Sequence, residues 1–184
     1  MKNTFDIYNW HNSLRLRWMV LPVLAYVASW MVAWGVFLFF PILVTVAQYL
    51  IFKIHPAVRR PGVWFLTLPV TFYIWTKWGP AMTYSQPNGI MHGVMAYYIG
   101  QIINTLFIPL ITTRGRPELL LNWLMGCLAA ATIWLVSYKL FIADWQADKL
   151  SPTRNLALYG IYPGIALIAN GVSSFFFTKQ IIKD

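Results

Sequence analysis

The sequence predicts an all-α integral membrane protein, with a six-helix bundle in one transmembrane domain (residues 18–184) and a cytoplasmic or interfacial N-terminal segment (residues 1–17). Of the 184 residues, 59% are hydrophobic and 10% are charged, whereas a soluble domain has roughly 45–50% apolar and about 25% charged residues. So few charged residues cannot cover a soluble fold, and so many apolar residues exclude intrinsic disorder. The single cysteine, Cys127, excludes an intramolecular disulfide scaffold.

Six apolar runs are the candidate membrane spans. A hydrocarbon core of ~30 Å needs about 20 helical residues, and local thinning of the bilayer accommodates shorter runs. Short charged or Pro/Gly-rich breaks separate the runs, as is typical of connecting loops. The predicted spans are residues 18–33, 36–52, 63–78, 90–110, 121–142 and 156–177.

The first two spans divide one uninterrupted stretch, because residues 18–52 contain no charged residue. A single helix of this length would extend ~52 Å, well beyond the hydrocarbon core. A turn at Ala33-Trp34-Gly35 places ten of the fourteen Lys and Arg residues on one face, whereas a single helix divides them seven to seven. Orientation rules favour the asymmetric arrangement, so we predict a multi-pass protein of the plasma (inner) membrane with both termini cytoplasmic. The ten are Lys2, Arg15, Arg17, Lys53, Arg59, Arg60, Arg114, Arg116, Lys179 and Lys183.

The net charge of +9 follows from this orientation rather than from nucleic-acid binding. The cations lie in short loops and form no nucleic-acid motif. The expected partners are therefore the lipid bilayer and other membrane subunits or further copies of this chain, with no nucleic acid.

The aromatic residues indicate where the spans meet the membrane surface. Most tryptophans, Trp18, Trp64 and Trp123 among them, fall near span ends, which predicts that their indoles lie at headgroup level. The alternating segment from Phe5 to Trp10 leaves two alternatives open, an amphipathic helix on the membrane surface and an ordered tail.

Each even-numbered span carries a carboxamide at a similar position, namely Gln48, Asn104 and Asn170. The spacing suggests three repeated helical hairpins, with coincidence in apolar sequence of low complexity as the alternative. A carboxamide in hydrocarbon needs hydrogen-bond partners, so we expect these side chains to face the bundle interior. There they either join helices or, if they meet on the axis, form a polar constriction or ligand site, with Gln101 as a further member.

Residue types that carry catalysis are scarce in the predicted spans. All five acidic residues fall in predicted loops or termini, and the sequence has no metal motif or catalytic triad. We therefore expect no enzyme. His92, at the start of the fourth span, is another ligand candidate, but an interfacial hydrogen bond is favoured over axial ligation of a haem or chlorin, so no cofactor is implied.

Arg59, Arg60, Arg114 and Arg116, the four loop arginines, lie in the two predicted cytoplasmic hairpin loops. Adjacent Pro and Gly residues favour turns there. Each cation at this surface gains ~1 kcal/mol from anionic lipid, which favours headgroup binding. The alternative is recognition of an anionic substrate or of a partner protein.

Two functions from different classes fit these features. The first is a transport or channel subunit for a small solute, with the four carboxamides along its path. The alternative is a non-catalytic accessory or scaffold subunit of a larger membrane complex, which docks through small residues such as Gly126 and Gly160-x3-Gly164. In size and span count the chain is similar to small solute channels and to substrate-binding subunits of vitamin uptake systems, which implies no role for any one residue. A water-lined centre would support the first function, and a dry, Phe-filled centre the second.

Overall fold

The chain is almost entirely helical, which confirms the predicted all-α class. The computed structural model describes residues 4–31, 35–78, 89–112, 117–143 and 152–178. Within these ranges the only β feature is an isolated bridge between Val58 and Thr112. The helices are α1 (Thr4–Trp30), α2 (Gly35–Ile54), η1 (Pro61–Thr67), α3 (Leu68–Trp78), α5 (Gly89–Asn104), η2 (Thr105–Phe107), α6 (Ile108–Ile111), α7 (Pro117–Phe141) and α9 (Pro152–Thr178).

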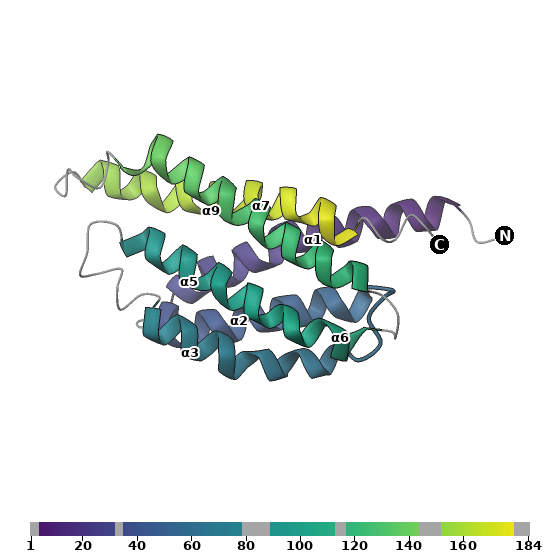
Figure 1. Ribbon diagram of the computed structural model, residues 1–184. Coiled ribbons are helices and arrows are strands. Elements are labelled where there is room, and N and C mark those ends of the chain that lie inside the picture. The colour runs from purple at the N-terminus through teal and green to yellow at the C-terminus, as the bar shows by residue number, and fades with distance from the viewer. Residues whose placement is uncertain (1–3, 32–34, 79–88, 113–116, 144–151, 179–184) are drawn as a thin grey trace.

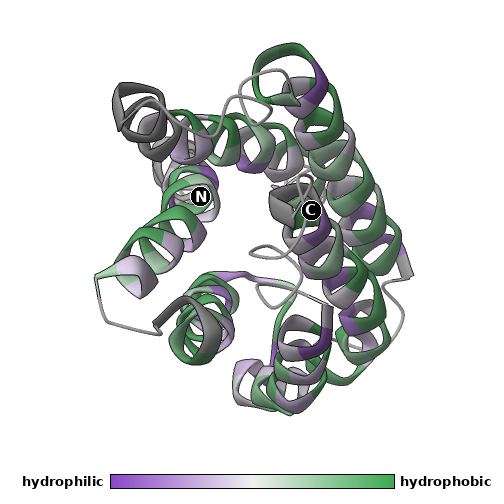
Figure 2. Cartoon of the chain, turned by 90° about the vertical axis from the view of Figure 1, so that its left-hand side faces the viewer, coloured by the Kyte–Doolittle hydropathy of each residue, from purple (hydrophilic) through white to green (hydrophobic). Residues whose placement is uncertain are grey.

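The described helices form six rods arranged in a closed ring. η1 continues into α3, and α5 continues through η2 into α6, so each of these groups is one rod. Each rod packs against the next along the chain, and α9 closes the ring by packing against α1. Figure 2 shows this ring end on, and Figure 1 shows α7 and α9 side by side along one edge. The pairs α1–α2, α3–α5 and α7–α9 are therefore three consecutive hairpins.

The charge-free run divides into two helices, as the charge distribution predicts. α1 ends at Trp30 and α2 begins at Gly35. α1 begins at Thr4, however, well before the predicted start of the first span at Trp18. Extending an existing helix adds one backbone hydrogen bond per residue, so the helix continues through the polar segment although the apolar run stops. From Thr4 onward the N-terminal segment is thus helical, and it forms the first part of α1.

The rod that contains α5 changes geometry near Pro109. Proline lacks an N–H, and its ring clashes with the carbonyl four residues earlier, here that of Thr105. The α-helix accordingly ends at Asn104, a 3-10 turn covers Thr105–Phe107, and α6 resumes with Pro109 in its first turn. Asn104 is therefore the last residue before the change.

The outer surface of the ring is apolar. Three helical stretches in the described residues are long and apolar enough to cross a membrane, namely His92–Ile111, Glu118–Phe141 and Gly160–Thr178, and Leu38–Ile54 is a shorter apolar helix. Every rod also exposes large apolar side chains, of which Leu24, Leu50, Tyr73, Leu106, Leu128 and Ile168 are examples. Exposed apolar surface of this extent marks a region that contacts lipid or another protein.

Two chain connections meet at one end of the ring. The backbone N–H groups of Arg59 and Arg60 donate to the carbonyl of Ile111 at 2.9 and 3.2 Å. At the same end, Nε of Arg15 donates to the Thr178 hydroxyl at 2.9 Å, which joins α1 to the end of α9. This basic end carries Arg15, Arg17, Lys53, Arg59 and Arg60, whereas Lys77 and Lys139 lie in the last turns of α3 and α7 at the opposite end.

Candidate functional site: a central polar cavity

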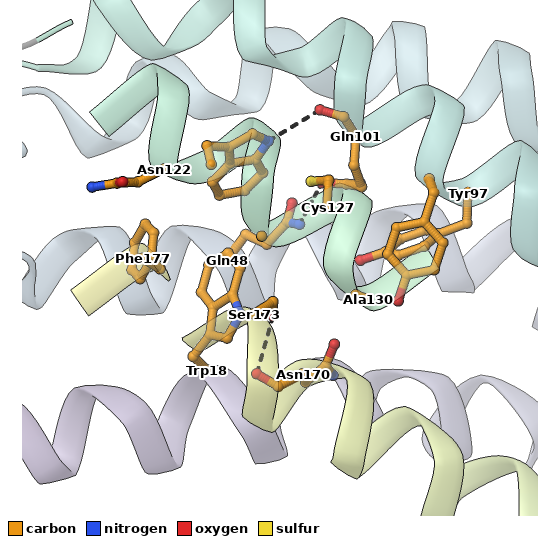
Figure 3. Close-up of a pocket in the computed structure, with 13 residues that line it drawn as sticks. Trp18, Gln48, Tyr97, Gln101, Asn122, Cys127, Ala130, Asn170, Ser173 and Phe177 are labelled. Carbon is orange, nitrogen blue, oxygen red and sulfur yellow. Dashed lines mark hydrogen bonds between the residues drawn. The ribbon is translucent and has the colours of Figure 1, made fainter. Parts of the chain in front are cut away.

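A small cavity lies between the helices at the centre of the ring. Its volume is about 30 Å³, which is room for roughly two water molecules. Residues of α1, α2, α5, α7 and α9 line it, so five of the six described rods reach it. The polar members are Gln48, Gln101, Asn122, Asn170 and Ser173, and the aromatic members are Trp18, Tyr97, Tyr98, Trp123 and Phe177 (Figure 3).

A directed chain of hydrogen bonds connects three helical rods beside this cavity. The indole Nε1 of Trp64 donates to Oε1 of Gln48 at 3.0 Å, and Nε2 of Gln48 donates to Oε1 of Gln101 at 2.7 Å. An indole N–H can only donate, so it fixes which end of the Gln48 amide faces Trp64. Gln48 must then present its NH₂ to Gln101, and Gln101 must present its oxygen in return.

The NH₂ group of Gln101 is left without an acceptor. Gln101 is only 2% exposed, and its Nε2 has no hydrogen-bond partner among the described residues. Its backbone carbonyl accepts a bond from the indole of Trp123 at 3.1 Å, which ties this part of α5 to α7. An unpartnered buried donor costs about 1–3 kcal/mol, so Gln101, a residue of the cavity lining, carries a buried donor that no described group uses.

Ser173 and the NH₂ group of Asn170, which also line the cavity, have partners within the protein. The indole of Trp18 donates to the Ser173 hydroxyl at 2.8 Å, and that hydroxyl donates to the carbonyl of Asn170 at 3.0 Å. Nδ2 of Asn170 points to the carbonyl of Met19 at 3.5 Å, from a partly buried position. These bonds link α1 to α9, and they leave the Ser173 hydroxyl no second proton to offer.

A cluster of five aromatic side chains closes the cavity toward the basic end. We call Trp18, Phe52, Trp64, Trp123 and Phe177 the aromatic cluster. The rings of Trp18 and Phe177 stack with centroids 4.2 Å apart, and those of Trp64 and Trp123 meet edge-on at 5.2 Å. Phe52 follows Gln48 by one helical turn, and Phe177 follows Ser173 by one turn, so these two rings lie one turn nearer the basic end than those polar groups.

The three tryptophans of this cluster, expected near the headgroups, are buried among the helices. Trp18, Trp64 and Trp123 are 9%, 0% and 2% exposed. Each indole N–H finds an acceptor inside the protein, so none of them needs the headgroup region to satisfy it. Trp30 and Trp78, by contrast, remain exposed near the opposite end of the ring.

The four carboxamides lie at similar depth but do not meet at one point. Gln48, Asn104 and Asn170 stand six, seven and eight residues before the ends of their rods. Gln48 bonds to Gln101, and Asn170 reaches the same cavity. Asn104 is fully buried but donates to the Thr71 hydroxyl at 2.9 Å, outside the cavity lining, and its Oδ1 has no partner among the described residues.

The remaining predicted site residues lie away from the cavity. The side chain of His92 is exposed on the first turn of α5 and is not part of the lining. Arg59 and Arg60 are exposed at the basic end, and Arg114 and Arg116 lie outside the described residues. Among the described residues, no group of three or more His, Cys, Asp or Glu residues is placed to hold a metal ion.

His55 is a buried polar residue that the sequence does not single out. It is 2% exposed, its Nδ1 accepts from the backbone N–H of Ala57 at 3.2 Å, and its ring lies 4.6 Å from that of Phe177. Because Nδ1 accepts, the ring proton is on Nε2, which faces the Phe177 carbonyl at 3.5 Å. A histidine within a basic loop looks solvated in sequence, and only the packing of α9 buries it.

Comparison with protein-family models, with curated proteins and with solved structures finds no match for this chain. The cavity and the ring around it are therefore the basis for assigning a function.

Proposed function

We propose that this chain is a six-span protein of the plasma (inner) membrane that acts as a transport or channel subunit and binds a small solute in its central cavity. The observation that carries the proposal is the convergence of Gln48, Gln101 and Asn170, from three different helices, on one cavity at the ring centre. Small-molecule sites are concave and largely apolar, with a few polar groups that fix the ligand's orientation. Carboxamides beside aromatic rings match that description.

The surface of the ring supports the membrane part of the proposal. Large apolar side chains are exposed on every described rod, including those too short or too polar to qualify as spans by themselves. Of the described cations, five lie at the basic end and three, Lys77, Lys139 and Arg154, at the opposite end. Positive charge concentrates on cytoplasmic loops, so the basic end, and with it both termini, is the cytoplasmic side.

The aromatic cluster supports occluded binding of the solute rather than a permanently open pore. Its rings pack against one another toward the basic end, and Trp18, Trp123 and Phe177 also line the cavity. A solute that enters from the opposite end would stop at this cluster until the side chains of Trp18 and Phe177 move. The polar side chains of the cavity wall also distinguish this centre from the dry, Phe-filled interior that we expect of a scaffold protein.

The cavity chemistry gives no support to catalysis. Among the residues that line it there is no carboxylate, histidine or other charged side chain. General acid–base catalysis relies most often on those groups, whereas the titratable side chains of this lining are Tyr97, Tyr98 and Cys127. The proposed function is therefore binding and passage of a solute.

Filling the cavity tests this function. Ala130 is buried on α7 and lines the cavity, whereas Leu128 is exposed on the same helix. Purified protein in lipid vesicles is supplied with a defined mixture of small polar solutes, and the vesicle contents are identified by mass spectrometry. We expect the wild type and Leu128→Phe to accumulate at least one solute over protein-free vesicles, and Ala130→Phe to lose that accumulation.

Two results would contradict the proposal. One is accumulation that is equal in Ala130→Phe and in the wild type, because transport would then bypass the cavity. The other is an absence of accumulation in every variant together with stoichiometric co-purification of another membrane protein from the native membrane, which would favour the scaffold function. Cavity-filling with the smaller Ala130→Leu change provides a second variant if the Phe variant does not fold.

A further inference from the structure

The polarity of the cavity wall is set by an indole that does not line the cavity. Trp64 donates to Gln48, Gln48 donates to Gln101, and each amide is thereby held in one of its two orientations. Reversing either amide would bring two NH₂ groups or two oxygens face to face. Since Trp64 is fully buried and its N–H cannot accept, the chain runs in one direction only.

The end of this chain is a donor. Nε2 of Gln101 is the one buried polar atom of the cavity lining, among the described residues, without a hydrogen-bond partner. A ligand group that accepts a hydrogen bond would satisfy it, and a group that only donates would not. The carboxamide of Gln48 and the hydroxyl of Ser173 are already committed to protein partners.

The cavity is also electrically neutral. Its described lining has no lysine, arginine, histidine, aspartate or glutamate. Moving an ion from water into such a site without a counter-charge is unfavourable. A carboxylate or phosphate ligand would therefore lack a cationic partner, and an ammonium ligand would meet both the wrong charge environment and a donor.

We propose that the solute is a neutral molecule bound through a carbonyl or carboxamide oxygen that accepts from Nε2 of Gln101. Its apolar part would lie beside Trp18 and Trp123, which line the same cavity. The volume of about 30 Å³ has room for the carbonyl or carboxamide group itself, about the space of two water molecules. This substrate class rests on the proposed function, because it describes the ligand of the same central site.

Three fluorinated probes of similar size and different charge test the proposal. They are 2-fluoroacetamide (neutral, with a carbonyl acceptor), fluoroacetate (anionic) and 2-fluoroethylammonium (cationic, donor only). Binding to the purified full-length protein in mild detergent is measured from ¹⁹F line broadening over a titration. We expect the dissociation constant of 2-fluoroacetamide to be at least tenfold lower than those of the two ions.

Variants on α5 separate the role of Gln101 from general damage. Gln101→Leu removes the free donor and should weaken 2-fluoroacetamide binding by about tenfold, the size expected for one hydrogen bond. Asn104→Leu is the matched control, because it removes another buried carboxamide of the same helix that lies outside the cavity lining. It should leave the dissociation constant unchanged.

A change at a distance tests the polarity itself. Trp64→Phe removes the indole donor, so Gln48 can reverse and let Gln101 turn its oxygen toward the cavity. The preference for 2-fluoroacetamide over 2-fluoroethylammonium should then decrease, an effect that loss of packing alone would not produce.

The outcomes distinguish the two proposals. If the probes bind and Ala130→Phe abolishes binding, but the ions bind as well as the amide or Gln101→Leu has no effect, the substrate class is wrong and the central site stands. If Ala130→Phe and the wild type behave alike for all three probes, both proposals are wrong.

Discussion

A tight contact between α7 and α9 yields a quantitative prediction at Gly126. A methyl group added at this position on α7 would lie 3.3 Å from the backbone oxygen of Ser173 and 3.5 Å from its Cβ, on α9. The first distance is tighter than an ordinary van der Waals contact, and a backbone oxygen cannot rotate away. Gly126→Ala therefore requires α7 and α9 to separate. Gly164 on α9 has nothing within 4 Å of the same added atom, so Gly164→Ala is a matched control.

The magnitude follows from two terms, one of which is common to both variants. Alanine is favoured over glycine within a helix by about 0.5–1 kcal/mol, and this gain applies at either position. Overpacking a tight contact costs typically 1–3 kcal/mol, and this cost applies only at Gly126. The difference between the two variants thus isolates the contact, and at about 2–4 °C per kcal/mol it corresponds to a melting temperature roughly 5 °C lower for Gly126→Ala.

The chain supplies its own reporter of unfolding. Cys127 is the single cysteine of the sequence and is buried. A thiol-reactive fluorogenic dye therefore gives a signal only as the protein opens on heating in detergent. Tryptophan emission is the second readout, because Cys127 adjoins Gly126 and local loosening alone would otherwise affect the dye.

The reasoning is refuted if Gly126→Ala melts at the same temperature as Gly164→Ala, or above it. Such a result would mean that α7 and α9 do not approach each other as closely at Gly126 as the structure has it. A lower melting temperature for Gly164→Ala would refute it equally, because that position would then be in contact with something.

Three further changes have expected outcomes. Trp64→Phe leaves one end of the Gln48 amide buried without a hydrogen-bond partner, so the free energy of unfolding should fall by roughly 1–3 kcal/mol. The exposed Trp78→Phe should change it by less than about 0.5 kcal/mol, and equal effects would mean that the indole bond contributes nothing. In a cysteine-free background, Arg60→Cys should be labelled by an impermeant reagent only from the cytoplasmic side and Lys77→Cys only from outside; the reverse pattern would invert the proposed topology. Replacing all four loop arginines by lysine should leave insertion, folding and solute accumulation nearly unchanged, because lipid attraction needs only charge; loss of accumulation with correct insertion would make these loops a recognition site.

Most helix boundaries could be predicted from the sequence, because they depend on how apolar and charged residues alternate along the chain. The division of the charge-free run into two helices was predicted from charge asymmetry, and α1 ends at Trp30 while α2 begins at Gly35. The start of this helix at Thr4 was not predicted, because the polar segment before Trp18 contains no apolar run that would indicate a helix. Hydropathy marks where a helix is apolar rather than where its hydrogen bonds begin.

Contacts between helices depend on which residues face each other across the interface, and sequence patterns predicted these contacts less well. Gly160 and Gly164 have the spacing that permits close helix approach, yet nothing lies within 4 Å of an added Cβ at either position. Gly126, in a less regular series of small residues, faces the backbone of Ser173. A small residue allows an approach, but the rotation of both helices decides whether one occurs.

The same rotation explains why Gln101 rather than Asn104 serves the cavity. The two residues are three positions apart on α5, which places them about 60° from each other around a helix of 3.6 residues per turn. Both directions point into protein, because α5 packs against α3 on one side and α7 on the other. Asn104 faces α3, where its NH₂ group donates to the Thr71 hydroxyl, and Gln101 faces the centre, where its oxygen accepts from the NH₂ group of Gln48.

Hydropathy alone predicts that both amides are buried, and a repeat pattern favours Asn104. The property that matters for a ligand, a free NH₂ on the axis, arises only because Trp64 from a third rod presents an N–H that cannot accept. It is therefore a property of three helices in one rotational arrangement, which no single helix encodes.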